Sequence, residues 1–306
     1  MSSPALLVSD TLTRRPRSRH FLLCPPAFFD VRYAINPWMD PSVRVDVDRA
    51  LSQWSALVAS YRAYGHRVEL LDPVRGLPDM VFAANGATVV DGYVLQARFA
   101  HRQRRAEARH HRRWHAQHAL QAGVTGPTSP RNARAVNEGE GDFAVLAHRV
   151  LAGHGFRTTQ AAHRELAVLT GREVLSLELV DPHFYHLDVA LTVLDDERDH
   201  IAYYPPAFSE QSQRLLAGLF PDAIIADDED AQVLGLNCVS DGLHVWVPSG
   251  AEHLARLLAE VGYHVIRTDL SELLKGGGSV KCCTQEIRPS LTATPSSPAR
   301  ESRATA

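Results

Sequence analysis

One pattern recurs along the chain and constrains its fold more than any other feature. It is an amphipathic helix, then a glycine or short turn, then an apolar strand. The helix–strand units are expected at residues 48–71, 102–124, 160–179, 210–226 and 251–268. A helix that leads directly into a strand needs a sheet to pack on, so the recurrence indicates an α/β protein built from similar modules.

Between these units the sequence predicts strands, several of them paired through turn residues. They are expected at residues 80–96, 143–152, 186–204 and 233–247 and from residue 280 onward. Asp-Gly pairs at 91–92 and 241–242 favour antiparallel hairpins, which count against an open, all-parallel, doubly wound sheet. A quasi-repeat of roughly 40 to 60 residues that mixes hairpins with one helix each instead predicts a closed ring of modules.

Length and composition set the limits of this architecture. The chain has 306 residues and 45% hydrophobic content, enough for a full core. We expect one domain over residues 19–288, between disordered tails at 1–18 and 289–306. A net charge of -3 gives no reason to expect nucleic acid or membrane, and no segment approaches the ~20 apolar residues of a membrane span. Four cysteines without a CxxC pair fit a reducing cytoplasm.

A glycine-rich stretch near the C-terminus, GGGSVKCC, ends in two adjacent thiols, Cys282 and Cys283. Glycines let a backbone approach a ligand closely, and a thiol beside them is well placed to act as a nucleophile. Because neighbours on a strand face opposite ways, only one of the two cysteines is expected to enter a pocket. The alternative is that both are small buried apolar residues beside a glycine turn.

Carboxylates and a histidine form the next candidate group. His186 and Asp188 stand two apart in a predicted strand, so they share one face of an otherwise apolar segment, which favours a functional site. In EGEGD, acids alternate with glycines, and Glu138 and Glu140 are both candidates. This segment is either an acidic surface turn or a carboxylate cluster for a cationic substrate.

Polar residues at the ends of other strands complete the candidates. Asp79 and Asn85 flank a predicted buried strand, although Asn85 before a glycine is also typical of a turn. Arg98 and Arg157 follow strands, where an arginine at a pocket rim can bind a carboxylate in bidentate fashion. Asn36 lies in a loop rich in hydrogen-bonding and stacking groups.

A histidine-rich segment follows Arg98. His111 and His115 have the spacing of the zinc motif HExxH, but its glutamate is absent. We therefore expect a solvated helix face and no metal site.

Taken together, these residues resemble the guanidino-modifying enzymes of the pentein fold, which include arginine deiminase, dimethylarginine dimethylaminohydrolase, amidinotransferases and arginine dihydrolase. The resemblance covers about residues 20–288 and rests on CPPAFFDVRYAINPWM, PDMVFAANG, LQARF, EGEGD, GHGFR, FYHLD, YYPPAF and GGGSVKC. It implies a five-module α/β propeller with pseudo-fivefold symmetry around a central active site, and it implies neither a metal nor an organic cofactor.

The resemblance also implies roles for the candidate residues. Cys282 matches a nucleophile present as a preformed thiolate, and His186 matches the general acid and base. Glu138 and Asp188 match the acids that bind the guanidinium, and Arg98 and Arg157 match the clamp on the substrate carboxylate. Asn85 joins the predicted catalytic set, and Asn36 and Asp79 the predicted substrate-binding set.

The expected function is hydrolysis of the guanidino group of arginine. Asn85 stands where deiminases and dimethylarginine hydrolases usually carry aspartate, so the resemblance favours an arginine dihydrolase that releases ornithine, carbon dioxide and ammonia. One alternative is dimethylarginine hydrolysis to citrulline and dimethylamine. An alternative of another class is an inactive pentein that binds or regulates. The expected partner is arginine or a methylated arginine, and a homo-oligomer is compatible with the sequence.

Overall fold

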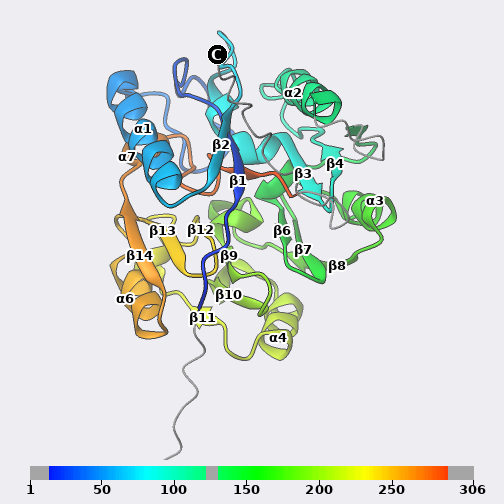
Figure 1. Cartoon of the computed structure of the whole chain (residues 1–306), viewed down its shortest axis with the longest axis vertical. Helices are drawn as coiled ribbons and strands as arrows, with labels where there is room; N and C mark the ends of the chain where they lie inside the picture. The colour runs from blue at the N-terminus through cyan, green and yellow to red at the C-terminus, as the bar shows by residue number, and fades with distance from the viewer. Residues whose placement is uncertain (1–13, 122–129, 289–306) are drawn as a thin grey trace, which may run out of the picture.

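Five three-stranded sheets make up the β structure of the computed structural model, which describes residues 14–121 and 130–288 (Figure 1). In spatial order the strands are β15 (Gln285–Glu286), β1 (His20–Leu23) and β2 (Arg67–Leu70); β3 (Ala87–Val90), β4 (Tyr93–Gln96) and β5 (Arg131–Asn132); β6 (Phe143–Val145), β7 (Arg149–His154) and β8 (Glu173–Glu178); β9 (Leu191–Asp195), β10 (His200–Tyr203) and β11 (Ile224–Ile225); and β12 (Val239–Ser240), β13 (His244–Pro248) and β14 (His264–Thr268).

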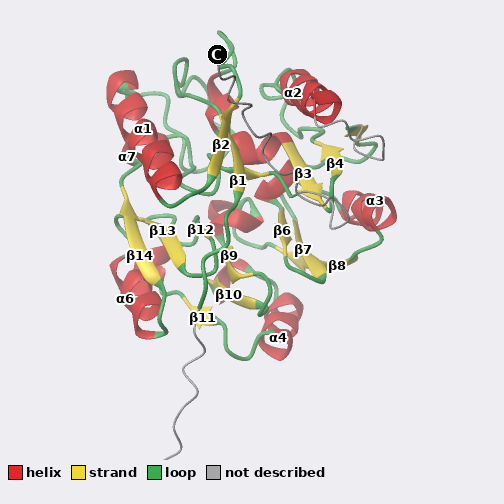
Figure 2. Cartoon of the chain, in the orientation of Figure 1, coloured by secondary structure: helices red, strands yellow, loops and turns green. Residues whose placement is uncertain are grey.

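All five sheets share one topology. An antiparallel pair is followed by a parallel third strand, which requires a crossover connection. The crossover helices are α1 (Val47–Ala63), α2 (Ala108–Gln121), α3 (Gln160–Thr170), α4 (Glu210–Leu219) and α6 (Glu252–Glu260). They lie at the periphery, outside the strands (Figure 2). In the first sheet the antiparallel partner of β1 is β15, so the two ends of the described chain meet there.

The predicted helices are confirmed because their apolar spacing matches real buried faces. In α1 the side chains of Trp54, Leu57 and Tyr61 are buried, and Asp46 caps the first turn by accepting a hydrogen bond from the Arg49 amide. Helix α3 ends at Gly171, whose φ of 71° is in the left-handed region that favours glycine. No helix within the described ranges is long and apolar enough to cross a membrane.

Four predicted strands are wrong at the positions that matter for the site. In the one predicted at residues 233–247, residues 232–236 form a turn and the strand β12 begins only at Val239. Pro78–Val81 (η1) and Ala83–Gly86 (η2) are 3-10 turns, so Asp79 and Asn85 do not flank a strand. His186 directly precedes another such turn, η5 (Leu187–Val189), and Cys282 lies in a turn before β15. The reason is that a buried turn carries the same apolar run as a buried strand, so periodicity cannot distinguish them.

The predicted tails fall mostly outside the described residues, which exclude 1–13 and 289–306. The last part of the expected N-terminal tail is described and lies against the sheets. There the Arg17 amide donates to the Asp241 carbonyl at 2.9 Å, and the Arg17 guanidinium pairs with Asp195 at 2.8 Å. Gly123 and Val124, expected to begin a strand, also lie outside the described residues, and the parallel strand of that module is β5.

Candidate active site

Tight turns before the first strand of each sheet carry the polar side chains of the site. Asn85 precedes β3, Glu138 and the 3-10 turn η3 (Gly139–Gly141) precede β6, and Asp188 precedes β9. Asn237 precedes β12, and Cys282 precedes β15. Each sheet therefore presents one short polar turn, and hydrogen bonds connect these turns to one another.

The thiol of Cys282 lies between two of these turns. Its Sγ is 3.3 Å from Oδ2 of Asp188 and 3.2 Å from Nδ2 of Asn237, and the residue is 2% exposed. Burial, followed by the charge of Asp188, raises the pKa of the Cys282 thiol well above its ordinary value. This direction disfavours the preformed thiolate that the resemblance implies, and the thiolate stays a prediction.

Cys282 and Cys283 both pack in the apolar core, but the contacts to Asn237 and Asp188 are made by Sγ of Cys282. The Cys283 amide donates to the Ser279 carbonyl at 3.2 Å, and burial raises the pKa of the Cys283 thiol. The two thiols thus have different surroundings, as the sequence suggested, although the two residues lie in a turn and not in a strand.

Glu138 is the centre of a buried charged group. One carboxylate oxygen accepts from Arg157 Nη1 at 2.8 Å and from His186 Nε2 at 2.9 Å, and the other accepts from the Ala100 amide at 3.1 Å. Burial alone would raise the pKa of Glu138, but Arg157 and His186 outweigh burial and hold it well below its usual range. Glu138 is therefore ionised, and it fixes the orientation of the imidazole.

Asp188 and Asp142 are among the buried carboxyls that have raised pKa values. Burial is the first cause in both, and it raises the pKa of Asp188 to about 7 and that of Asp142 to about 6. Asp142 accepts from the Thr158 hydroxyl at 2.7 Å and the Leu187 amide at 3.1 Å, and it lies 3.9 Å from Nε2 of His186. It supports the turn that carries His186, a role that the sequence analysis missed.

Asn85 is held from both ends of its amide. Its Nδ2 donates to the Glu138 carbonyl at 3.2 Å, and its Oδ1 accepts from Arg104 Nη1 at 2.7 Å. Arg104, also missed from the sequence, is buried and paired with Glu107 at 2.8 Å. A Cβ at Gly141 would lie 2.3 Å from Nδ2 of Asn85, so only glycine fits beside this amide.

Asp79 and Asn36 lie beside the site in supporting positions. Asp79 accepts a hydrogen bond from the Tyr33 hydroxyl at 2.7 Å and is 3.9 Å from Arg104 Nε. Asn36 donates to the Gly276 carbonyl at 3.2 Å, which attaches its loop to the glycine-rich stretch.

The two predicted arginines lie in different environments. Arg157 is buried, and its guanidinium already donates to Glu138 and, at 2.6 Å, to the Ile35 carbonyl. Arg98 is exposed and donates to the Arg134 carbonyl, while its backbone pairs with Asn137 next to Glu138. Arg157 therefore supports Glu138 in this structure, and the carboxylate clamp stays a prediction.

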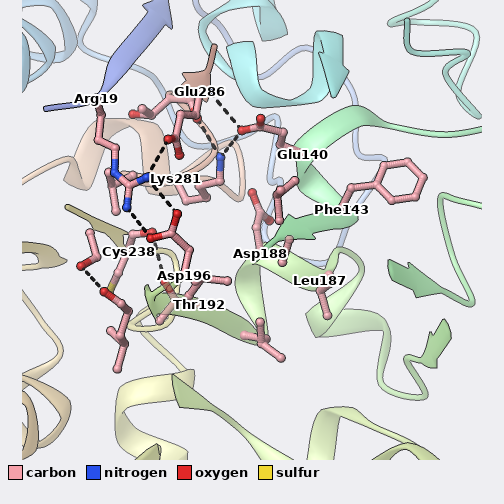
Figure 3. A pocket seen from close by; sticks show the side chains of 18 of the residues that line it. Arg19, Glu140, Phe143, Leu187, Asp188, Thr192, Asp196, Cys238, Lys281 and Glu286 are labelled. Atoms are coloured by element: carbon pink, nitrogen blue, oxygen red, sulfur yellow. Dashed lines mark hydrogen bonds and ion pairs between the residues drawn. The ribbon is translucent and has the colours of Figure 1, made fainter. Parts of the chain in front are cut away.

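Glu140 lies apart from His186, in an ion network on the wall of a cavity of about 60 Å³ (Figure 3). Its carboxylate accepts from Lys281 Nζ and Arg288 Nη1, each at 2.5 Å, and from the Glu286 amide at 3.0 Å. Asp188 lines the same cavity. Of the two acids that the sequence left open, it is Glu138 that lies beside His186.

The predicted solvated face of the histidine-rich helix is wrong for His111 and His115, which are both buried. Burial, followed by neighbouring positive charge, lowers the pKa of His111 to about 3, and burial lowers that of His115 to about 4. Both rings are neutral at pH 7. In the described residues, two groups have metal-ligand atoms within 4.8 Å of one another, and neither contains a residue of this site: His20, Glu69 and His118; Asp227, Asp230 and His253.

The arrangement suits covalent catalysis on a cation. A buried thiol lies against one carboxyl, and an imidazole held by an ionised carboxylate is available for proton transfer. Two acidic groups in one buried site favour a substrate that brings positive charge with it.

Comparison with known proteins agrees with this chemistry. Residues 33–195 match the family described as N,N dimethylarginine dimethylhydrolase, eukaryotic. The N(G),N(G)-dimethylarginine dimethylaminohydrolase of Mycobacterium tuberculosis is 51% identical over 276 residues, which span 90% of this chain and 88% of that protein. The bifunctional arginine dihydrolase/ornithine cyclodeaminase ArgZ of Synechocystis is 34% identical, over 87% of this chain and 37% of that protein.

A solved structure gives the same picture. The N-terminal domain of ArgZ, an arginine dihydrolase from cyanobacteria crystallised with its substrate, superposes with a TM-score of 0.82 at 33% identity, covering 89% of this chain and 99% of that domain. The fold and site therefore define a pentein, a member of the superfamily of guanidino-modifying enzymes. Within it, the chain belongs to the dimethylarginine dimethylaminohydrolase family and is a hydrolase of guanidino C–N bonds.

Proposed function

We propose that this protein hydrolyses methylated arginine to citrulline and an alkylamine through a covalent adduct on Cys282. The observation that carries the proposal is the Cys282 thiol 3.3 Å from Asp188, in a site that also holds the Glu138–His186 pair. The 51% identity to a dimethylarginine dimethylaminohydrolase supports methylated arginine over arginine as the substrate.

The proposed first half-reaction begins when the guanidinium enters between the carboxyls. Its positive charge lowers the pKa of the buried thiol, and the thiol proton passes to a neighbouring base. The sulfur then bonds to the guanidino carbon, and the C–N bond to dimethylamine breaks. His186, held by Glu138 at 2.9 Å, donates a proton to the departing amine.

The second half-reaction regenerates the thiol. His186, now neutral, accepts a proton from a water molecule that attacks the carbon of the thiouronium adduct. The C–S bond breaks, the second proton of that water passes to the sulfur, and citrulline leaves with the water oxygen in its ureido group. Arginine or monomethylarginine follows the same steps with ammonia or methylamine as the leaving group.

Arginine dihydrolysis to ornithine, the leading expectation from the sequence, is the less supported candidate. It requires the amide of Asn85 to bind the neutral ureido group for a second round. In the described geometry Oδ1 is engaged by Arg104, and Nδ2 already donates to the Glu138 carbonyl. The relatives also favour dimethylarginine hydrolysis, because the dimethylarginine dimethylaminohydrolase is 51% identical to this chain and the arginine dihydrolase is 34% identical.

One product assay separates these candidates. Purified protein is incubated with arginine, monomethylarginine and both dimethylarginines, and citrulline, ornithine, ammonia and alkylamines are quantified, with Cys282→Ser as the control. The proposal expects citrulline and alkylamine in equal amounts and no ornithine. Ornithine with two equivalents of ammonia would support the dihydrolase instead, and no turnover of any substrate would support the inactive binding protein.

We also infer that the five sheets form a closed propeller with pseudo-fivefold symmetry. Their common topology and the pairing of β15 with β1 support this inference. A cytoplasmic location and a homo-oligomeric state stay predictions. Light scattering after size-exclusion chromatography tests the oligomeric state, because an oligomer has a mass above the 33.7 kDa of one chain.

A further inference from the structure

Asn237 occupies the one turn of the five to which the sequence assigned no role. It comes two residues before β12 (Val239–Ser240), as Asn85 comes two residues before β3 (Ala87–Val90). Its side chain is fully buried, at 0% exposure. A buried amide at this place must satisfy its polar atoms inside the protein, so its contacts define what it does.

The oxygen of this amide holds the nucleophile turn. Oδ1 of Asn237 accepts from the backbone amides of Ser279 and Cys282, both at 3.1 Å. Its backbone carbonyl accepts from the Lys281 amide, also at 3.1 Å. Three amides of the segment that carries the thiol are therefore bonded to one residue from another sheet.

The nitrogen of the amide faces the reacting sulfur. Because two N–H donors fix the position of Oδ1, the NH₂ group must point the other way, and it donates to the Asp188 carbonyl at 3.0 Å and to Cys282 Sγ at 3.2 Å. Asn237 thus connects the turn of Asp188 to the turn of Cys282.

The groups around the sulfur show why this donor matters. The charges of Asp188 and Cys283 both raise the pKa of the Cys282 thiol, so they oppose the formation of a thiolate. The adjacent Lys281 instead donates to Glu140 and to the Thr284 carbonyl. Nδ2 of Asn237 donates to Sγ at 3.2 Å, and a hydrogen bond from the Ser279 backbone also acts to lower the pKa of this thiol.

We propose that Asn237 is a positioning residue for the reaction, which sets Cys282 against Asp188 and stabilises the thiolate with an amide hydrogen bond. A hydrogen bond to a charged acceptor is stronger than one to a neutral acceptor, so the bond strengthens as the thiol ionises. This role deepens the proposed function, because it explains how a buried sulfur becomes nucleophilic without a cationic side chain bonded to it.

The test compares Asn237→Asp with the wild type. Aspartate keeps both acceptor contacts to the turn but places an oxygen where the NH₂ faced Sγ, so it raises the cost of forming the thiolate. Alkylation of Cys282 by iodoacetamide is followed against pH by mass spectrometry of the peptide that contains it. We expect the midpoint of alkylation to rise by at least one pH unit. This shift corresponds to a tenfold lower thiolate fraction at any pH below the midpoint. We also expect kcat to fall at least a hundredfold.

The matched control is Thr192→Val. It removes a buried hydrogen bond to the Cys238 carbonyl, next to Asn237, and leaves the contacts of Cys282 intact. We expect its alkylation midpoint and kcat to stay at the wild-type values. The alkylation arm needs no substrate, so it tests Asn237 even if the product assay overturns the proposed activity.

A second variant, Asn237→Ser, protects the test against misfolding. Serine removes the amide without adding charge, and we expect its midpoint to rise in the same direction. An unchanged midpoint in either folded variant overturns the proposal. Failure of both variants to fold, judged by circular dichroism, assigns Asn237 to the scaffold alone and also overturns it.

Discussion

Replacing Glu138 by glutamine tests the buried charged group that orients His186. The substitution keeps the shape of the side chain but removes its charge. An amide nitrogen placed at Oε2 would face the donors of Arg157 and His186, and one placed at Oε1 would face the Ala100 amide. Whichever way the amide turns, at least one donor meets another donor, and the buried Arg157 loses its counter-charge.

The magnitude follows from these contacts. Breaking a buried ion pair by removing one partner costs about 3–5 kcal/mol, since the other charge stays buried and unpaired. At about 2 °C per kcal/mol for a domain of this size, the melting temperature should fall by roughly 6–10 °C. Activity should fall further, by at least about 10³-fold, because a catalytic imidazole that loses its orienting carboxylate loses about that much.

The pH dependence gives an independent measure. Arg157 and His186 depress the pKa of Glu138 in the folded protein, so the stabilisation is present above the unfolded value and is lost as the pH falls through the folded one. The free energy of unfolding, measured with urea between pH 2.5 and 7, should therefore depend less on pH in Glu138→Gln than in the wild type.

The matched control is Glu272→Gln, which removes a buried carboxylate paired with Lys275 at 2.7 Å, in the helix α7 (Ser271–Leu274). It should lower stability while kcat/KM changes less than threefold. If Glu138→Gln keeps kcat/KM within tenfold of the wild type, or unfolds in acid along the same curve, the assigned roles of Glu138 are incorrect.

Three further predictions follow from the same geometry. Cys282→Ser should abolish turnover while Cys283→Ser keeps at least a tenth of it, and a substrate adduct trapped on Cys283 by mass spectrometry would reverse the assignment. Agmatine, which lacks the α-carboxylate, should have a kcat/KM at least 10²-fold below that of arginine. In Arg98→Ala the difference in kcat/KM between the two substrates should be smaller. Equal kcat/KM values for both substrates in the wild type would exclude a carboxylate clamp. The pKa of Asp188, about 7, is raised above its unfolded value, so stability falls as the pH rises through 7. In Asp188→Asn, the free energy of unfolding measured with urea should therefore change less between pH 4.5 and 7.5 than in the wild type. An unchanged slope would show that Asp188 does not titrate there.

Local sequence determined the repeating elements of this protein. Helical spacing of apolar residues placed α1, α3, α4 and α6, and the turn residues Asp91-Gly92 and Asp241-Gly242 separate the paired strands. These signals are readable because they depend on neighbours within a few positions along the chain. Local motifs also indicated the thiols after the glycines and the acids of EGEGD as candidate site residues.

Only the tertiary structure decided which members of these groups share the site. Glu138 and Glu140 are alike in sequence, but the first contacts His186 and the second contacts Lys281. Asn237 lay inside the strand predicted at residues 233–247 and carried no signal of a role, because its bonds reach across 45 positions to Cys282. The physical reason is that burial and hydrogen bonding between distant turns set pKa values and orientations, and no local pattern records which turns will meet.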